Sequence, residues 1–84
     1  MKNRSAWNEE DNRLKASFEF DDFVQAFSFM SKVADEAEKL NHHPYWSNVY
    51  NKVTVVLSTH DAGDIVTEKD HSLAARIDSL YQQV

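Results

Sequence analysis

The sequence contains no cysteine, and it has only one glycine and one proline in 84 residues. Without cysteine the chain can form neither a disulfide nor a thiolate metal site, and we expect the reducing cytoplasm as its compartment. The shortage of glycine excludes a glycine-rich phosphate loop and a Gly-x-Ser-x-Gly nucleophile turn. With so few glycine and proline residues there is also no candidate linker, and we expect residues 1–84 to form a single domain.

An excess of positive charge and long apolar runs are absent as well. The 14 acidic residues against 9 basic ones give a net charge of −5, which disfavours binding to a nucleic-acid backbone. No stretch approaches the roughly 18 apolar residues of a membrane span, and the first residues lack an apolar signal core. Because a chain this short buries only about two thirds of its unfolded surface, we expect association between subunits to add stability.

Alternation of apolar and polar residues predicts three strands. Residues 14–20 alternate strictly, which is typical of a half-buried strand with an inward face made of Leu14, Ala16, Phe18 and Phe20. Residues 46–50 and 52–60 are also expected as strands, connected through Asn51-Lys52. Trp46 and Tyr50 are then interpreted as structural aromatic residues of the sheet and core. Trp7 is expected to fold back onto the domain from a less regular N-terminal arm.

A spacing of three and four residues predicts two helices. The first covers about residues 22–40, capped by Asp21 or Asp22, with an apolar stripe made of Phe23, Ala26, Phe27, Met30, Val33, Ala34, Ala37 and Leu40. Val24 and Phe29 lie off this stripe, either as ordinary surface residues or in a contact with another subunit. Thr67 and Asp70 resemble a capping box at the start of a closing helix, which gives Asp70 a mainly structural role.

Together these elements predict an α+β two-layer sandwich. We expect a four-stranded antiparallel sheet with helices on one face, around a strand-helix-strand-strand-helix core.

Histidine is the unusual constituent, with four copies of which three fall within residues 42–60. Imidazole gives and takes protons near neutral pH, which suits general acid and base catalysis. His42 and His43 follow the first helix and are restrained by Pro44, and His60 lies at the end of a predicted strand. From the residues alone, two interpretations are about equally supported: these histidines form a functional site, or they are unrelated surface or core residues. His71 is left outside the site.

A metal site is the main alternative, because three histidines can hold a catalytic zinc ion. The spacing does not favour it: successive side chains of an extended segment point apart, whereas a helical pair of ligands prefers His-x-x-x-His. We therefore expect no metal.

The run Glu38-Lys39-Leu40-Asn41-His42-His43-Pro44, followed by Tyr50, His60 and Asp70, resembles the signature of the pterin-4a-carbinolamine dehydratases. That family is also known as the dimerisation cofactors of a homeodomain transcription factor. The spacing between these elements agrees throughout, and the resemblance covers about residues 18–81. Two departures are Asn41, where animal members commonly carry Asp, and a segment from His60 to Asp70 that is one residue longer.

The resemblance implies dehydration of a 4a-hydroxytetrahydropterin to the quinonoid dihydropterin, without metal or cofactor, in the recycling of the pterin used by aromatic amino acid hydroxylases. It implies that His42 and His60 lie nearest the leaving hydroxyl and that His43 mainly holds the ring. The substrate-binding set that we expect consists of Glu38, His42, His43, Pro44, Ser58, Thr59, His60, Asp61 and Ala62. Glu38 is equally consistent with a solvated surface residue.

The resemblance also implies partners. Members of the family form homodimers by joining sheets edge to edge, and homotetramers through helix packing. An alternative function is a binding module for a helical segment of a transcription factor. A pure binding module has no need of His42, His43 and His60 at this spacing, so the enzyme is favoured.

Overall fold

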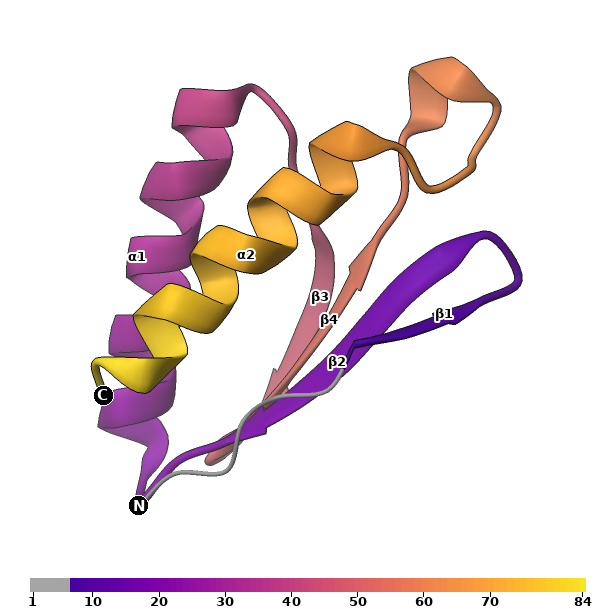
Figure 1. The fold of residues 1–84 in the computed structure, drawn as a ribbon. Helices are drawn as coiled ribbons and strands as arrows, with labels where there is room; N and C mark the ends of the chain where they lie inside the picture. The colour runs from indigo at the N-terminus through magenta and orange to yellow at the C-terminus, as the bar shows by residue number, and fades with distance from the viewer. Residues whose placement is uncertain (1–6) are drawn as a thin grey trace.

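The computed structural model describes residues 7–84. In chain order the elements are β1 (Asn8–Glu10), β2 (Arg13–Glu19), α1 (Phe23–Leu40), β3 (Tyr45–Val49), β4 (Lys52–Leu57), a 3₁₀ turn η1 (His60–Ala62) and α2 (Glu68–Gln82). The strands form one antiparallel sheet in the order β1-β2-β4-β3, and both helices lie on the same face of it (Figure 1). The predicted α+β two-layer sandwich is confirmed.

The hydrophobic core lies between the sheet and the helices. Alternate residues of β2 and β4 point inward, as their sequence alternation predicts, and α2 packs its apolar stripe against them. The side chains with less than 2% exposure include Phe18, Phe29, Val33, Val53, Val55, Leu57, Leu73 and Ile77. Phe18 and Phe29 also contact Tyr81, with ring centroids 4.9 and 6.0 Å from that of Tyr81. This core fixes the positions of the C-terminal ends of α1 and β4, which precede the signature histidines, and of the start of α2, which carries Asp70.

The short strand β1 is the element that periodicity does not locate. It pairs with β2 through a two-residue turn at Asp11 and Asn12, whose φ angles are 52° and 61°. Asp and Asn tolerate this left-handed conformation better than other non-glycine residues, so the turn forms without glycine. Trp7 folds back as predicted: its indole N–H donates to Asp78 Oδ1 at 3.0 Å, and its ring contacts Phe18.

The face of α1 that packs against the core differs from the predicted one. Asp22 is the N-cap, accepting from the backbone N–H of Gln25 at 2.9 Å, but Phe29 is buried whereas Phe23 and Phe27 are exposed. The predicted stripe included both exposed phenylalanines and excluded Phe29, and this part of the prediction is wrong. The buried stripe is narrow, because only Ala26, Phe29, Val33 and Ala37 face the core fully. Ala34, also placed on the stripe, is exposed.

The β3–β4 hairpin also needs two corrections. Val49 pairs with Lys52, so the connection is Tyr50-Asn51 rather than Asn51-Lys52. The prediction that Tyr50 is a strand and core residue is wrong, since it lies in the turn with φ 50° and is 62% exposed. Trp46, in contrast, is half-buried and packs against the core.

Candidate active site

The end of α1 places His42. Asn41 adopts a left-handed conformation with φ 52° at the C-cap, and the backbone N–H of His42 donates to the carbonyl of Ala37 at 3.0 Å. This cap turns the chain sharply back toward the sheet. His42 is thereby buried, with 9% exposure, while the adjacent His43 faces solvent.

His42 is held by Asp70. Its Nε2 lies 2.5 Å from Asp70 Oδ1, in a pair whose carboxylate is fully buried at the start of α2. A carboxylate can only accept, so this nitrogen carries the proton, and neutral His42 has its lone pair on Nδ1. The orientation of the ring and its tautomer are therefore set by Asp70.

Asp70 also connects α2 to the segment after β4. Its Oδ2 accepts from the backbone N–H of Thr67 at 2.9 Å, which completes the predicted capping box, and from the hydroxyl of Thr59 at 2.8 Å. Thr59 in turn shares a hydrogen bond of 2.6 Å with the Thr67 hydroxyl. The carboxylate is thus both the cap of a helix and the link between His42 and the segment that carries His60.

His60 does not lie in a strand. β4 ends at Leu57, and Thr59 forms an isolated bridge with Ile65, so that His60 begins the turn η1. Its side chain is 90% exposed, and Nδ1 lies 2.9 Å from Asp64 Oδ1. The hydrogen bond that His60 donates to Asp64, and secondarily the charges of Asp64 and Asp61, raise the pKa of His60 from its ordinary value.

His43 forms a separate pair on the surface. Its Nε2 lies 2.6 Å from Glu38 Oε2, one turn earlier on α1, and both side chains are more than half exposed. Glu38 therefore contacts His43 while its own side chain remains 77% exposed. Pro44 follows, half-buried, before β3 begins.

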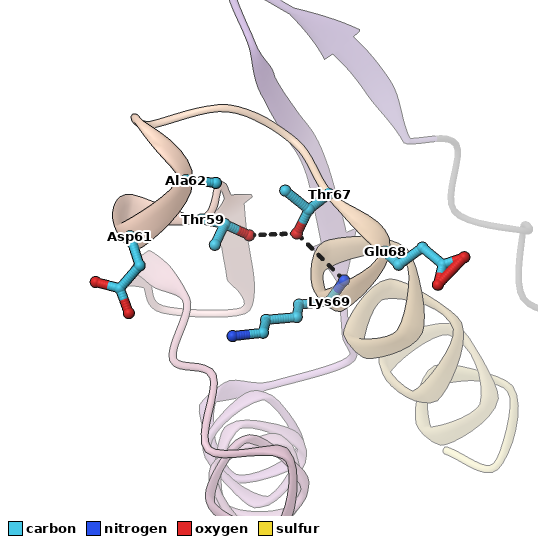
Figure 2. A pocket seen from close by; sticks show the side chains of 6 residues that line it. All are labelled: Thr59, Asp61, Ala62, Thr67, Glu68 and Lys69. Atoms are coloured by element: carbon cyan, nitrogen blue, oxygen red, sulfur yellow. Dashed lines mark hydrogen bonds between the residues drawn. The ribbon is translucent and has the colours of Figure 1, made fainter.

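A shallow pocket of about 320 Å³ lies where the loop after β4 meets the start of α2 (Figure 2). Three of its lining residues, Thr59, Asp61 and Ala62, belong to the substrate-binding set that the sequence predicted. Ser58 lies just before them and is half-buried.

The other half of the pocket was not predicted, and consists of Thr67, Glu68 and Lys69. Figure 2 shows the Thr59 and Thr67 hydroxyls directed at one another, while the Lys69 side chain extends beside them and Glu68 points away. The sequence identified these residues as a helix start. Nothing in its pattern indicated that this start faces the loop of His60.

The described residues 7–84 contain no group of three or more His, Asp or Glu side chains arranged to hold a metal ion. Each signature histidine is instead paired with one carboxylate: His42 with Asp70, His43 with Glu38, and His60 with Asp64. Neither α1 nor α2 is both long and apolar enough to cross a membrane.

Comparison with known families gives a match over most of the chain. The family model described as pterin 4 alpha carbinolamine dehydratase matches residues 1–80. A protein of Solibacter usitatus (strain Ellin6076), provisionally named pterin-4-alpha-carbinolamine dehydratase, is 50% identical over 80 residues, which cover 95% of this chain and 83% of that protein. A protein of Rhizobium meliloti (strain 1021) with the same provisional name is 56% identical over 74 residues, covering 88% of this chain and 70% of that protein.

Solved structures agree in fold. The crystal structure of a transcriptional coactivator/pterin dehydratase from Brucella melitensis superposes with a TM-score of 0.85 at 43% identity, covering 89% of this chain and 81% of the other. A pterin dehydratase-like protein identified as a RuBisCO assembly factor in the alpha-carboxysome has a TM-score of 0.74 at 22% identity, covering 94% and 90%. The second likeness concerns the fold alone.

Proposed function

The chain belongs to the pterin 4 alpha carbinolamine dehydratase family, and from that premise we propose that it is a hydro-lyase acting on a 4a-hydroxytetrahydropterin. The observation that carries the proposal is the buried Asp70 carboxylate. It binds His42 at 2.5 Å and Thr59 at 2.8 Å, and so joins the end of α1 to the loop that bears His60. Asp70 therefore joins the segments that carry two histidines 18 positions apart in the sequence, since Thr59 directly precedes His60.

The chemistry requires a proton at the leaving oxygen. Loss of hydroxide from C4a is slow at neutral pH, whereas a protonated hydroxyl leaves as water with the electrons of the C–O bond. A ring nitrogen then gives up its proton, which completes the quinonoid dihydropterin. We assign these two proton transfers to His42 and His60, each worth about 10² to 10⁴-fold for a positioned acid or base.

The remaining residues hold the ring. His43, oriented by Glu38, and Pro44 would contact the flat pterin from the end of α1. Backbone and side-chain groups of Ser58, Thr59, Asp61 and Ala62 would bind its edge, where pterins carry several donors and acceptors. We expect the reaction to take place in the cytoplasm, in recycling of the pterin spent by an aromatic amino acid hydroxylase, and without metal or cofactor.

A stopped-flow assay of dehydration tests the assignment, using freshly generated 4a-hydroxytetrahydropterin. We expect His42→Ala and His60→Ala each to lower the rate by about 10² to 10⁴-fold. His71→Ala is the matched control, because His71 is exposed on α2 and outside the site. Parent activity no faster than buffer would remove the enzyme hypothesis. If both variants instead dehydrated the pterin as fast as the parent, the roles given to His42 and His60 would be overturned.

Exposed apolar residues support self-association as a further part of the proposal. Phe23 and Phe27 stack on the outer side of α1 with ring centroids 5.8 Å apart, and Val24 beside them is 73% exposed. On the edge strand β3, Tyr45 and Val49 are 79% and 76% exposed. We propose that these surfaces are contacts of a homodimer or homotetramer.

The α1 surface also favours the alternative function, a binding module for a helical protein partner. The test is activity in the absence of any partner. Rapid dehydration by the purified chain supports the enzyme, whereas an inactive chain that retains its oligomeric state supports the module.

A further inference from the structure

The contact between His60 and Asp64 lies outside the family signature. Asp64 falls in the segment that is one residue longer than in animal members, and it matches no residue of the signature. Its Oδ1 nevertheless lies 2.9 Å from His60 Nδ1. A carboxylate accepts hydrogen bonds only, so Nδ1 carries a proton and Nε2 is left on the other side of the ring for exchange with a ligand.

The loop backbone holds Asp64 in place for this contact. The N–H of Thr59 donates to the carbonyl of Ile65 at 2.8 Å, and the N–H of Asp64 donates to the carbonyl of Thr59 at 3.1 Å. Gly63 and Asp64 both adopt left-handed conformations, with φ of 95° and 61°. These turns reverse the chain, so the Asp64 side chain meets the imidazole four residues earlier.

We propose that Asp64 is a positioning residue for His60, one that presents Nε2 to the pterin and keeps Nδ1 protonated throughout the reaction. The inference rests on the proposed function and names a carboxylate that the family signature does not contain. When Nε2 gives its proton to the leaving hydroxyl, the neutral ring that remains is the Nδ1–H tautomer, which Asp64 stabilises. The same hydrogen bond therefore stabilises both the imidazolium before proton transfer and the neutral Nδ1–H tautomer of His60 after it.

The acidic side chains on the loop of His60 act in the same direction. Asp64 and Asp61 favour the imidazolium and raise its pKa. The two charged residues that α2 contributes to the adjoining pocket, Glu68 and Lys69, are of opposite sign. A raised pKa keeps His60 protonated at higher pH than an ordinary histidine, which extends the range in which it can act as an acid.

Two variants remove the carboxylate without straining the turn. Asn and Gly both tolerate a left-handed backbone, so we expect Asp64→Asn and Asp64→Gly to fold. Asp35→Asn, which removes an exposed carboxylate from α1, is the control for net charge. Long-range ¹H–¹⁵N NMR spectra of the imidazoles give the tautomer and the pKa of His60, and stopped-flow dehydration between pH 5.5 and 9 gives the rate profile.

We expect both Asp64 variants to titrate His60 at lower pH. We expect Asp64→Gly, which leaves no side-chain acceptor, also to lose the Nδ1–H preference of neutral His60. Dehydration should be nearly unchanged at pH 6, but about 3- to 10-fold slower at pH 8, because the alkaline limb moves to lower pH. Asp35→Asn should leave tautomer and profile as in the parent. A parent that dehydrates the pterin, combined with an unchanged tautomer in Asp64→Gly or an unchanged rate profile in both Asp64 variants, overturns this inference alone. Loss of the tautomer preference with no dehydration by the parent overturns the proposed function, and with it the catalytic role of Asp64.

Discussion

Replacing the buried carboxylate of Asp70 tests the framework of the candidate site most directly. Asp70→Ala removes the acceptor for three donors, namely the Thr67 N–H, the Thr59 hydroxyl and His42 Nε2. Loss of the cap alone costs about 1 kcal/mol, and hydrogen bonds to a charged group are worth roughly 1.5–3 kcal/mol each. Because such terms are not additive, we expect a total loss of about 3–5 kcal/mol, as for other buried pairs that lose one partner.

That loss is large for this chain. A domain of this size has a free energy of unfolding of roughly 4–13 kcal/mol, so the variant will be marginally folded. Asp70→Asn should be milder, at about 1–2 kcal/mol, because the amide oxygen can still accept from Thr67 and Thr59. Its NH₂ group then faces His42 Nε2, which forces that nitrogen to become an acceptor. We therefore expect Asp70→Asn to fold and to lose most of its dehydration activity.

The measurement is urea-induced unfolding, followed by tryptophan fluorescence at one fixed protein concentration. Glu68→Gln is the matched control, since it removes an exposed carboxylate from the same first turn of α2. We expect that control to lose less than about 1 kcal/mol. If Asp70→Ala were no less stable than Glu68→Gln, the hydrogen-bond network assigned to Asp70 would be refuted.

Three further outcomes follow from the structure. Phe29→Ala should lower the free energy of unfolding by about 3–5 kcal/mol, whereas Phe27→Ala in a monomeric fraction should lower it by less than about 1 kcal/mol; equal losses in urea titrations would contradict the observed register of α1. Hydrogen bonds from Arg76 and Lys39 lower the pKa of Glu36 below 4.5, so their stabilisation is present above that pH and is lost as the pH falls through the lower, folded-state pKa. Arg76→Gln should therefore be less stable than the parent at pH 7, and the difference should disappear in acid; a difference that persists in thermal melts at pH 2 would exclude this origin. Val49→Lys on β3 should reduce the mass measured by light scattering if that edge is a subunit contact, and an unchanged oligomer would exclude it.

Much of the fold could be predicted because periodicity reports burial directly. The alternation in β2 and β4, the cap at Asp22 and the capping box at Thr67 are local patterns, and the structure contains all of them. The prediction was wrong where one local sequence pattern is compatible with two different structures. On α1, three- and four-residue spacing admits a stripe through Phe27 or one through Phe29, and only the sheet beneath the helix selects Phe29.

The candidate site divides in the same way. The candidate residues for the proposed chemistry could be named from the sequence, because His42, His43 and His60 follow the family spacing. The surroundings of these histidines could not be predicted, because the sequence does not show which side chain each imidazole contacts. The sequence predicts Asp70 only as part of a helix cap, and the structure shows that the same carboxylate also contacts His42.

The sequence by itself determined the order of the helices and strands other than β1, the family and the identity of the signature histidines, because each is expressed in spacing along the chain. Only the tertiary structure decided how each imidazole is oriented. His42, buried on Asp70, and His60, exposed beside Asp64, have the same side chain but opposite surroundings. Burial and hydrogen-bond partners arise from segments that meet in space, and these set the tautomer and the protonation of a histidine.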